Sequence, residues 1–373
     1  MVLLYGDIIF MTQDELYRKE FENIISFDNL YNGLKDSCRN VRWKSSVMSY
    51  EMNAIQNTYQ LRQDLLNGKY KIQPYQIFQI HEPKERTIVA TIIRDRQFQH
   101  SLVDNYLYDQ LTKSFIRDNC ACLRNRGVDD CLHRMTRHLR KHYIGHGNNG
   151  YALKCDIHHF FQSIDHDIAK EAVRKRVPNP YILKYVYDII DSFNVGIGLG
   201  SQVSQLIALC ILDDLDHYIK ERLKIKYYIR YMDDFVLIHE DKEYLNYCLK
   251  KIEEKLSSIG LRLNGKTGIC KLSQGVSLLQ WRFVLSNSGK IYKFTNRKKV
   301  YKECKKIRKI YPKEVNGRIY DGATFYSIKS CLANLKRGDT YYEQSKIIDY
   351  YNNIVRRRTG NGKTNSREKT CEA

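Results

Sequence analysis

Two short segments in the N-terminal third of the chain alternate apolar and polar positions. Residues 75–80 and 87–90 follow this period-two pattern, which predicts the two strands of a hairpin. Residues 13–67 look helical instead, and they end at Asn67-Gly68, a usual helix C-cap. The chain is therefore predicted to begin with helices and to continue into a hairpin.

The middle of the chain combines helices with one strand that ends on an acid. Residues 95–145 are predicted to be helical with a basic face, and a strand over 151–155 runs directly into Asp156. A helix is expected over 167–193. A glycine-rich loop follows, and a second long helix then reaches Leu223.

Two apolar strands next flank a turn that carries two acids. Residues 226–230 and 235–239 are the predicted strands, and the turn between them holds Asp233 and Asp234. A helix over 241–258 comes next, and the end of the chain looks helical. Between these lie two short predicted strands, near 269–272 and 278–284. The mixture predicts an α+β protein.

Composition shifts clearly only near the C-terminus, where the chain becomes polar and basic. We predict a helical extension over 1–70, a central α+β domain over 71–294, a helical domain over 295–358 and a disordered basic tail over 359–373. Met11 precedes a polar helical start, so it is a candidate start of translation beside Met1.

Charge adds a class of partner to this picture. Lys and Arg number 62 against 42 Asp and Glu, which gives a formal net charge of +20. An excess of this size favours binding a polyanion such as nucleic acid, although a merely soluble basic protein would also show it. The 29 tyrosines decide nothing, because Tyr packs in cores as readily as it stacks on bases.

Cysteine usage and hydropathy indicate the compartment. The 11 cysteines are scattered and none forms a CxxC pair, so reduced thiols in a cytoplasmic protein are expected. The apolar start, Val2-Leu3-Leu4-Tyr5, has no basic region before it, and no apolar run is long enough to span a membrane. No membrane partner is expected.

The acids at the strand ends are the candidate chemistry. Asp is common in ordinary turns, but a hairpin usually places Gly after the first acid, and here Asp234 follows Asp233. Adjacent like charges raise one another's pKa, and a divalent cation removes that penalty. If the strand that ends at Asp156 lies beside this hairpin, three carboxylates converge, and such a set suits magnesium together with phosphate oxygens.

These residues resemble the motifs of a known family. The segment 154–161 resembles motif A of reverse transcriptases, the tetrapeptide 231–234 resembles motif C, and the gap of about 77 residues between their acids suits that family. The resemblance implies a right-hand polymerase fold, with fingers and an antiparallel palm sheet over 71–294 and a helical thumb over 295–358.

The resemblance also implies a two-metal nucleotidyl transfer. Two Mg²⁺ ions, which Mn²⁺ can replace, would be held by Asp156, Asp233, Asp234 and the backbone carbonyl of Ile157. Leu263-Asn264-Gly265-Lys266-Thr267 looks like motif D, where Lys266 would protonate or neutralise the pyrophosphate. The segment 278–282 is similar to the primer grip.

Fingers motifs precede these segments in the family's order. Lys84 and Arg86 are candidate contacts for the phosphates of a dNTP, whereas Arg94 and Arg96 are open to a structural role as partners of carboxylates. Phe161 matches the aromatic gate against a ribose 2′-hydroxyl. Its alternative is core packing, a role that suits Phe160 better.

The loop 199–205 is the most discriminating segment. Most of the family has Gln first and Pro last there, whereas this chain has Leu199 and Gln205. This pair resembles the reverse transcriptases of diversity-generating retroelements, which copy a template RNA with frequent errors at adenine. Leu199, Gly200 and Gln205 are therefore expected to contact the nucleotide, and Leu199 lacks the hydrogen bond with which Gln would favour a correct base pair.

The same resemblance implies partners and leaves alternatives. A structured template RNA, its RNA/DNA hybrid, dNTPs and a small basic helical accessory protein are the implied partners, in a bacterium or a prophage. A compact basic chain also fits an antiphage-defence or retron-type reverse transcriptase. A non-catalytic RNA-binding protein with a polymerase-like shell is a further alternative, against which the intact set Asp156, Asp233, Asp234 and Lys266 argues.

Several other patterns are weaker. Residues 260–267 fit the P-loop pattern GxxxxGK[ST], but a helix is predicted before them and a strand after them, the reverse of a P-loop. The glycines at 196–200 lack the dinucleotide spacing. We expect three histidines to be surface or loop residues, His158, His159 and His166. Three acids are expected to be solvated or salt-bridged, Asp213, Asp214 and Asp216.

Overall fold

The computed structural model describes residues 11–81, 85–310 and 322–358. The chain forms two compact units, and neither is one continuous piece of sequence. The first consists of Met1–Gly127, Cys155–Phe235 and Asn246–Thr267, and the second of Val128–Lys154, Val236–Leu245 and Gly268–Ala373. The predicted tail after residue 358 and the first candidate start, Met1, lie outside the described residues.

The first unit begins with the predicted helices. Thr12 and Glu15 form a capping box at the first of them, where the Thr12 hydroxyl accepts a hydrogen bond from the Glu15 N–H at 3.3 Å and the Glu15 carboxylate accepts one from the Thr12 N–H at 2.7 Å. Ser26 caps the second helix in a similar way. The four helices are α1 (Gln13–Ile24), α2 (Phe27–Cys38), α3 (Ser45–Met52) and α4 (Ala54–Leu66).

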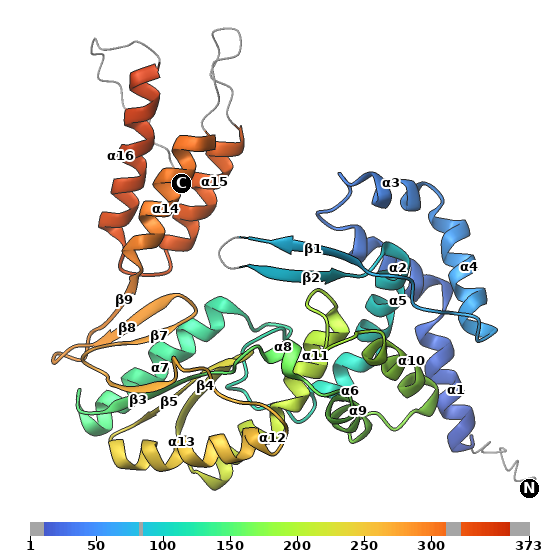
Figure 1. Cartoon of the computed structure of the whole chain (residues 1–373), viewed down its shortest axis with the longest axis horizontal. Helices are drawn as coiled ribbons and strands as arrows, with labels where there is room; N and C mark the ends of the chain where they lie inside the picture. The colour runs from blue at the N-terminus through green and yellow to red at the C-terminus, as the bar shows by residue number, and fades with distance from the viewer. Residues whose placement is uncertain (1–10, 82–84, 311–321, 359–373) are drawn as a thin grey trace, which may run out of the picture. The chain divides into compact units, whose positions relative to one another are not determined.

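A two-stranded hairpin follows, as predicted (Figure 1). β1 (Gln76–Ile80) pairs antiparallel with β2 (Arg86–Ala90), and Ile80 lies opposite Arg86 at the loop end. The helices α5 (Ile93–Leu102) and α6 (Tyr108–Thr112) come next, joined by the π-helical segment η1 (Val103–Leu107).

The prediction of continuous helix over 95–145 is wrong between residues 113 and 127. Here the backbone makes turns and bonds to a strand: the Arg230 N–H donates to the Asp118 carbonyl, and the Cys120 N–H donates to the Arg230 carbonyl, both at 3.0 Å. Positive φ angles at Cys122 and Asn125 also exclude a helix. The segment therefore covers the edge of a strand whose polar groups would otherwise be unpaired.

The rest of the first unit is mainly helical. The long helix expected up to Leu223 is instead three successive helical segments, and the first of them ends before Leu212. The helices are α8 (Phe160–Ser163), α9 (His166–Arg174), α10 (Pro180–Asp191), α11 (Gln202–Ile211), α12 (Asp213–His217) and the π-helical η2 (Tyr218–Arg222).

Four strands form the central sheet in the order β4-β5-β3-β6. The outer strand β6 pairs antiparallel with β3, and Tyr151 lies opposite Lys271. The division between the units runs through β3 and β5, so that Asp156 and Asp234 belong to the first unit. The strands are β3 (Tyr151–Asp156), β4 (Tyr227–Tyr231), β5 (Asp234–His239) and β6 (Gly268–Lys271), and α13 (Lys242–Ser257) follows β5.

The second unit carries one long helix, a second sheet and the C-terminal helices. α7 (Val128–His146) contacts β9 of a three-stranded antiparallel sheet, β7-β8-β9. These strands are β7 (Val276–Leu278), β8 (Trp281–Leu285) and β9 (Ile291–Thr295). No described helix combines the length and the apolar character that a membrane span requires.

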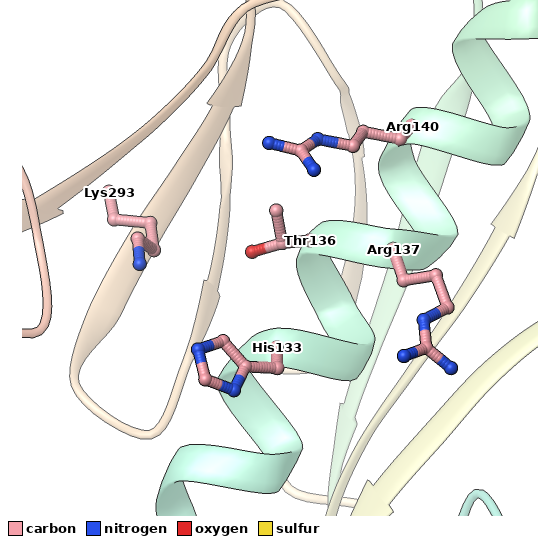
Figure 2. Close-up of a pocket in the computed structure, with 5 residues that line it drawn as sticks. All are labelled: His133, Thr136, Arg137, Arg140 and Lys293. Carbon is pink, nitrogen blue, oxygen red and sulfur yellow. The ribbon is translucent and has the colours of Figure 1, made fainter.

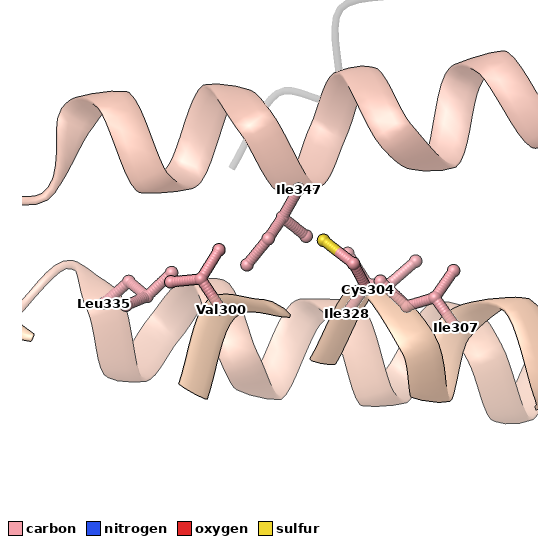
Figure 3. Packing of buried hydrophobic residues seen from close by; sticks show 6 residues of the cluster. All are labelled: Val300, Cys304, Ile307, Ile328, Leu335 and Ile347. Atoms are coloured by element: carbon pink, nitrogen blue, oxygen red, sulfur yellow. The ribbon is translucent and has the colours of Figure 1, made fainter. Parts of the chain in front are cut away.

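The last three helices pack together. α14 (Arg297–Ile310) contacts both α15 (Gly322–Leu335) and α16 (Tyr341–Arg358). Figure 3 shows the Ile347 side chain of α16 pointing toward the Cys304 and Ile328 side chains of the other two helices. The buried cluster consists of Val300, Cys304, Ile307, Ile328, Leu335 and Ile347.

Ile347 tests whether this cluster stabilises the helical bundle. Ile347 is fully buried (0% exposed), whereas its neighbour Ile348 is 41% exposed. Ile347→Ala is expected to lower the free energy of unfolding of the bundle by about 2–5 kcal/mol, because a cavity replaces packed methyl groups. Urea unfolding followed by circular dichroism measures the change. The matched variant Ile348→Ala should cost less than about 1 kcal/mol, and equal effects of the two variants would contradict this packing.

Candidate active site

The two adjacent acids lie in a tight turn between β4 and β5. The strands leave only Met232 and Asp233 between them, and Met232 adopts a left-handed conformation with φ of 57°. A residue other than glycine in this region stores strain of about 1–3 kcal/mol, which the surroundings have to offset. The Arg230 guanidinium contributes here, because its Nη1 donates a hydrogen bond to the Met232 carbonyl at 3.1 Å.

Arg230 is itself held by a buried acid. Its Nε and Nη2 donate to the two carboxylate oxygens of Asp216 at 2.7 and 2.5 Å, and the Tyr228 hydroxyl donates to the same carboxylate at 2.6 Å. Arg230 and Asp216 are both 0% exposed. Although burial alone would lower the pKa of the Arg230 guanidinium, the Asp216 carboxylate beside it raises that pKa above its usual value. The guanidinium therefore stays charged.

Backbone bonding brings the third acid to the same turn. β3 ends at Asp156, and the N–H of the next residue, Ile157, donates to the Asp233 carbonyl at 3.3 Å. The condition set by the sequence is therefore met, because the strand that ends at Asp156 lies beside the hairpin that carries Asp233. The side chains of Asp156, Asp233 and Asp234 are each partly exposed to solvent.

The loop before β6 completes the surroundings of Asp156. The Asn264 N–H donates to the Asp156 carbonyl at 2.7 Å, and the Asn264 side-chain amide donates to a carboxylate oxygen of Asp156 at 3.1 Å. Lys266 is exposed two residues further on. Sequence reasoning singled out Lys266 in this loop and missed Asn264. Its position directly before the Gly265-Lys266 pair is the one signal that could have pointed to it.

The charges of the acids reach a buried thiol. Burial raises the pKa of the Cys155 thiol, and the carboxylates of Asp234, Glu253 and Asp156 raise it further. Negative charge is therefore concentrated where β3 and β5 meet. A bound cation would be attracted to this region, and it would relieve the repulsion between the acids.

The residues present fit a magnesium site of the open kind. Within the described part of the chain, no three His, Cys, Asp or Glu side chains already form a metal cage. Mg²⁺ does not require one, because it is usually bound by one or two carboxylates, by water and by the phosphates of a substrate. The partly exposed Asp156, Asp233 and Asp234 offer such carboxylates beside open solvent.

The loop 196–201 connects two of the other predicted site segments. The Ile197 N–H donates to the Phe161 carbonyl at 2.9 Å, and the Val89 N–H of β2 donates to the Leu199 carbonyl at 3.3 Å. Gly200 has φ of 121°, and a Cβ there would lie 3.2 Å from the Val89 carbonyl oxygen. The glycine is thus required by backbone conformation and close packing.

Phe161 and Gln205 have different surroundings. Phe160 is buried, as expected for a core residue, and Phe161 is partly exposed. Gln205 lines a hollow of about 330 Å³. The other residues around this hollow are Asp104, Tyr108, Cys122, Leu123, Arg124, Gln202 and Leu206. Backbone hydrogen bonds thus join Phe161 and β2 to the loop that carries Leu199 and Gly200, and Gln205 of α11 lines a separate hollow.

The predicted fingers residues are only partly described. Lys84 lies outside the described residues, and of Arg86 only the backbone in β2 is described. Arg94 is a structural residue, because its guanidinium pairs with Asp64 at 2.8 Å and contacts Asp95 at 3.4 Å.

Of the remaining predicted acids and histidines, Asp213 and His166 have structural partners. Asp213 is buried and pairs with Arg176 at 2.9 Å, whereas the Asp214 side chain is 63% exposed. His166 donates to the Gly196 carbonyl at 2.8 Å. The P-loop pattern over 260–267 follows α13 and precedes β6, so it lacks the strand-loop-helix context of a phosphate site.

Comparison with known proteins defines the class of this fold and site. Residues 71–283 match the family described as reverse transcriptase (RNA-dependent DNA polymerase). This segment is more than half of the chain, so the chain belongs to the reverse transcriptase family, whose members are nucleotidyltransferases. The combination of helices and antiparallel strands agrees with the predicted right-hand polymerase fold of that family.

Individual relatives are distant. The protein YkfC of Escherichia coli strain K12 is 23% identical over 277 residues, which are 61% of this chain and 71% of YkfC. A telomerase from Candida albicans in complex with a fragment of telomeric RNA is 11% identical, with a TM-score of 0.48, over 77% of this chain and 55% of the telomerase. The apo telomerase from Candida tropicalis is 12% identical, with a TM-score of 0.48, over 77% and 62%. The chain thus spans less than two thirds of the length of these telomerases.

The buried pair beneath the turn can be tested by removing one charge. Asp216→Asn is expected to lower the free energy of unfolding by about 3–5 kcal/mol, because Arg230 would stay buried without a counter-charge. Chemical denaturation measures the loss. Asp214→Asn, on the same helix but exposed, should change stability by no more than about 0.5 kcal/mol. A loss for Asp216→Asn as small as that of the control would show that Arg230 does not depend on this pair.

Proposed function

We propose that this protein is an RNA-directed DNA polymerase that copies a structured template RNA into cDNA by two-magnesium nucleotidyl transfer. The observation that carries the proposal is the hydrogen bond from the Ile157 N–H to the Asp233 carbonyl, 3.3 Å long. It joins the end of β3 to the turn after β4, and so it supports a shared site for the acids of two separate motifs. Template RNA, the RNA/DNA hybrid and dNTPs are the proposed partners.

The acids would share the work of binding metal. Asp156, Asp233 and Asp234, with the backbone carbonyl of Ile157, would hold two Mg²⁺ ions, and Mn²⁺ is expected to substitute. When bound, such ions activate the primer 3′-hydroxyl and neutralise the leaving pyrophosphate. The side-chain amide of Asn264 fixes the Asp156 carboxylate through its hydrogen bond of 3.1 Å, which leaves the other carboxylate oxygen for a ligand.

Residues around the acids would position the nucleotide and the proton. The exposed ammonium of Lys266 would give a proton to the pyrophosphate or neutralise it. Phe161 would exclude a ribose 2′-hydroxyl, and Leu199 and Gly200 would lie along the nascent base pair. Lys84 and Arg86 would contact the triphosphate, and Gln205 would contact the nucleotide.

The subtype we propose is the error-prone enzyme of a diversity-generating retroelement. It rests on the apolar Leu199 and on Gln205, where most of the family has Gln and Pro. A small basic helical accessory protein would then assist the enzyme. The scattered cysteines support a reducing compartment, and we propose the cytoplasm of a bacterium, with the gene in its chromosome or in a prophage.

The genes next to this one would separate the subtype from its rival. A pair of near-repeats that differ at adenines, beside a gene for a small basic helical protein, is expected for a diversity-generating retroelement. Their absence would favour an antiphage-defence or retron-type reverse transcriptase, which the compact and basic chain also fits.

Removing the paired acids tests the catalytic site. The double variant Asp233→Asn plus Asp234→Asn is expected to lower dNTP incorporation on a primed RNA by more than about 100-fold, because positioning by metal supplies most of phosphoryl-transfer catalysis. Incorporation is measured with Mg²⁺ and again with Mn²⁺. The control Asp109→Asn plus Asp214→Asn removes two exposed acids, 75% and 63% exposed, and should keep full activity. Activity that survives in the first variant would overturn the site.

Restoring glutamine in the loop tests the proposed infidelity. Leu199→Gln is expected to lower misincorporation opposite adenine by about 5-fold, because one added hydrogen bond to the correct pair contributes about 1 kcal/mol. Sequencing of cDNA made by the purified variant measures the error spectrum. Leu199→Met keeps an apolar side chain and should leave the spectrum unchanged. An identical spectrum for Leu199→Gln and the parent enzyme would refute this explanation of the errors.

A further inference from the structure

A second basic surface lies on α7, within the second unit. The helix buries one apolar face and leaves the other to solvent. His133, Arg137 and Arg140 follow one another on the exposed face at the i, i+4, i+7 spacing of a helix. The buried face consists of Cys131, Leu132, Met135, His138, Leu139 and His142.

A strand of the neighbouring sheet turns this face into a groove. The groove is a hollow of about 380 Å³, and no acidic residue lines it. Figure 2 shows the Arg140 guanidinium reaching from α7 toward the strand that carries Lys293, with His133 below it. Five residues line the hollow, His133, Thr136, Arg137, Arg140 and Lys293.

The cations of the groove are not used inside the protein. Within the part of the chain that the structure describes, no carboxylate forms an ion pair with Arg137, Arg140 or Lys293. Most exposed arginines on other helices do have such a partner, for example Arg174 with Glu171 at 2.8 Å. Arg140 and Lys293 carry like charges on opposite walls of the hollow (Figure 2), so an anion bound between them would be stabilised.

The two walls of the groove are held in place at both ends. At the start of α7, Asp129 accepts two hydrogen bonds from Arg337, at 2.6 and 3.2 Å, which also lower the pKa of the Asp129 carboxyl. Near the end of the helix, the Tyr143 hydroxyl donates to the carbonyl of Asn287, in the turn between β8 and β9, at 3.0 Å. The groove is therefore built before any ligand arrives, which lowers the entropy cost of binding.

Lys293 is fixed through its backbone while its ammonium stays available. Its N–H donates to the Asp339 carboxylate at 2.7 Å, and its carbonyl accepts from the Asp339 N–H at 2.9 Å. Asp339 is thus engaged with the backbone and does not neutralise the side chain. The strand position is defined, and the positive charge remains directed to solvent or to a ligand.

We propose that the groove between α7 and β9 binds the phosphate backbone of a base-paired RNA segment. This inference rests on the proposed function for the identity of the nucleic acid as RNA. No residue of the groove belongs to the unit that carries Asp156, Asp233 and Asp234. The groove would thus hold the folded template RNA through a contact of its own, in addition to any contact at the acids.

The side chains that line the groove favour contacts with the phosphate backbone of RNA over contacts with its bases. No Phe, Tyr or Trp side chain lines the hollow, so it lacks the large aromatic surfaces on which unpaired bases stack best. Arginine instead offers a fork of donors that matches phosphate oxygens. From His133 to Arg140 the helix rises about 10 Å, a length that faces about three phosphates of one strand.

Binding of a short blunt RNA duplex with blocked ends tests the proposal. The full chain is titrated without divalent metal, so catalysis plays no part, at salt concentrations between about 50 and 200 mM. The groove variant is Arg140→Gln plus Lys293→Gln. Its charge-matched control is Lys141→Gln plus Lys250→Gln, which removes two exposed lysines outside the groove. Far-UV circular dichroism confirms that both variants fold.

The groove variant is expected to bind the duplex about 10-fold more weakly and to reduce the salt slope by about 2, because each lost phosphate contact removes about 0.9 from it. The control should lose less than about 2-fold. Equal losses in the two variants would overturn the proposal. So would an unchanged affinity for the duplex with a loss for an unpaired strand of equal length, or displacement of the duplex by inorganic phosphate or dNTPs at concentrations near their cellular levels.

The same preparations separate this proposal from the function on which it rests. If the wild-type protein binds the duplex through the groove but never extends a primed RNA, the proposed polymerase activity is wrong and the proposed groove function is unaffected. If the wild-type protein extends a primer but the groove and control variants bind the duplex equally, only the proposed groove function is wrong.

Discussion

Arg230 carries a positive charge that no water reaches, and the geometry of the acids depends on how that charge is satisfied. One side of the guanidinium bonds to both carboxylate oxygens of Asp216, and its remaining nitrogen bonds to the Met232 carbonyl. Removing a charge of this kind from water is costly unless a paired acid and further hydrogen bonds offset the penalty. The hydrogen bond to the turn contributes to this compensation. The Arg230–Asp216 pair therefore holds Met232 and the two acids after it, and the same pair holds α12 against β4.

Much of the fold could be predicted because the pattern of apolar and polar residues depends on local secondary structure. The hairpin at 76–90 alternates apolar and polar residues, and the strands that end at Asp156 or flank Asp233 are short, mainly apolar runs. The segment 113–127 could not be predicted in this way. Its conformation is set by hydrogen bonds to Arg230, more than a hundred residues away in sequence, and such bonds leave no periodic trace. The break at Leu212 is similar. Asp213 and Asp216, which follow it, are buried in ion pairs with Arg176 and Arg230, and such pairs also leave no periodic trace.

Some residues of the candidate site could likewise be predicted from the sequence, and others could not. Asp156, Asp233 and Asp234 could be singled out because acids directly after apolar strands are rare without a purpose. Asn264 could not, since an asparagine in a glycine-containing loop usually indicates only a turn. Asp216 was grouped with Asp213 and Asp214 as one acidic run, although Asp216 is 0% exposed and the Asp214 side chain is 63% exposed. The sequence pattern predicted that all three acids lie on a helix. It did not show which face of that helix another element would cover.

The hydrogen bond between Val89 and Leu199 has a thermodynamic consequence. It ties β2 of the hairpin to the loop before α11, and Gly200 allows the two backbones to approach closely. Ordering of either segment therefore reduces the conformational entropy that the other has still to lose. By linkage, any ligand that stabilises the hairpin must stabilise the loop by the same coupling free energy, and the reverse holds equally. Substitutions along β1 and β2 would then alter how firmly residue 199 is held, and through that residue they would alter the choice of base.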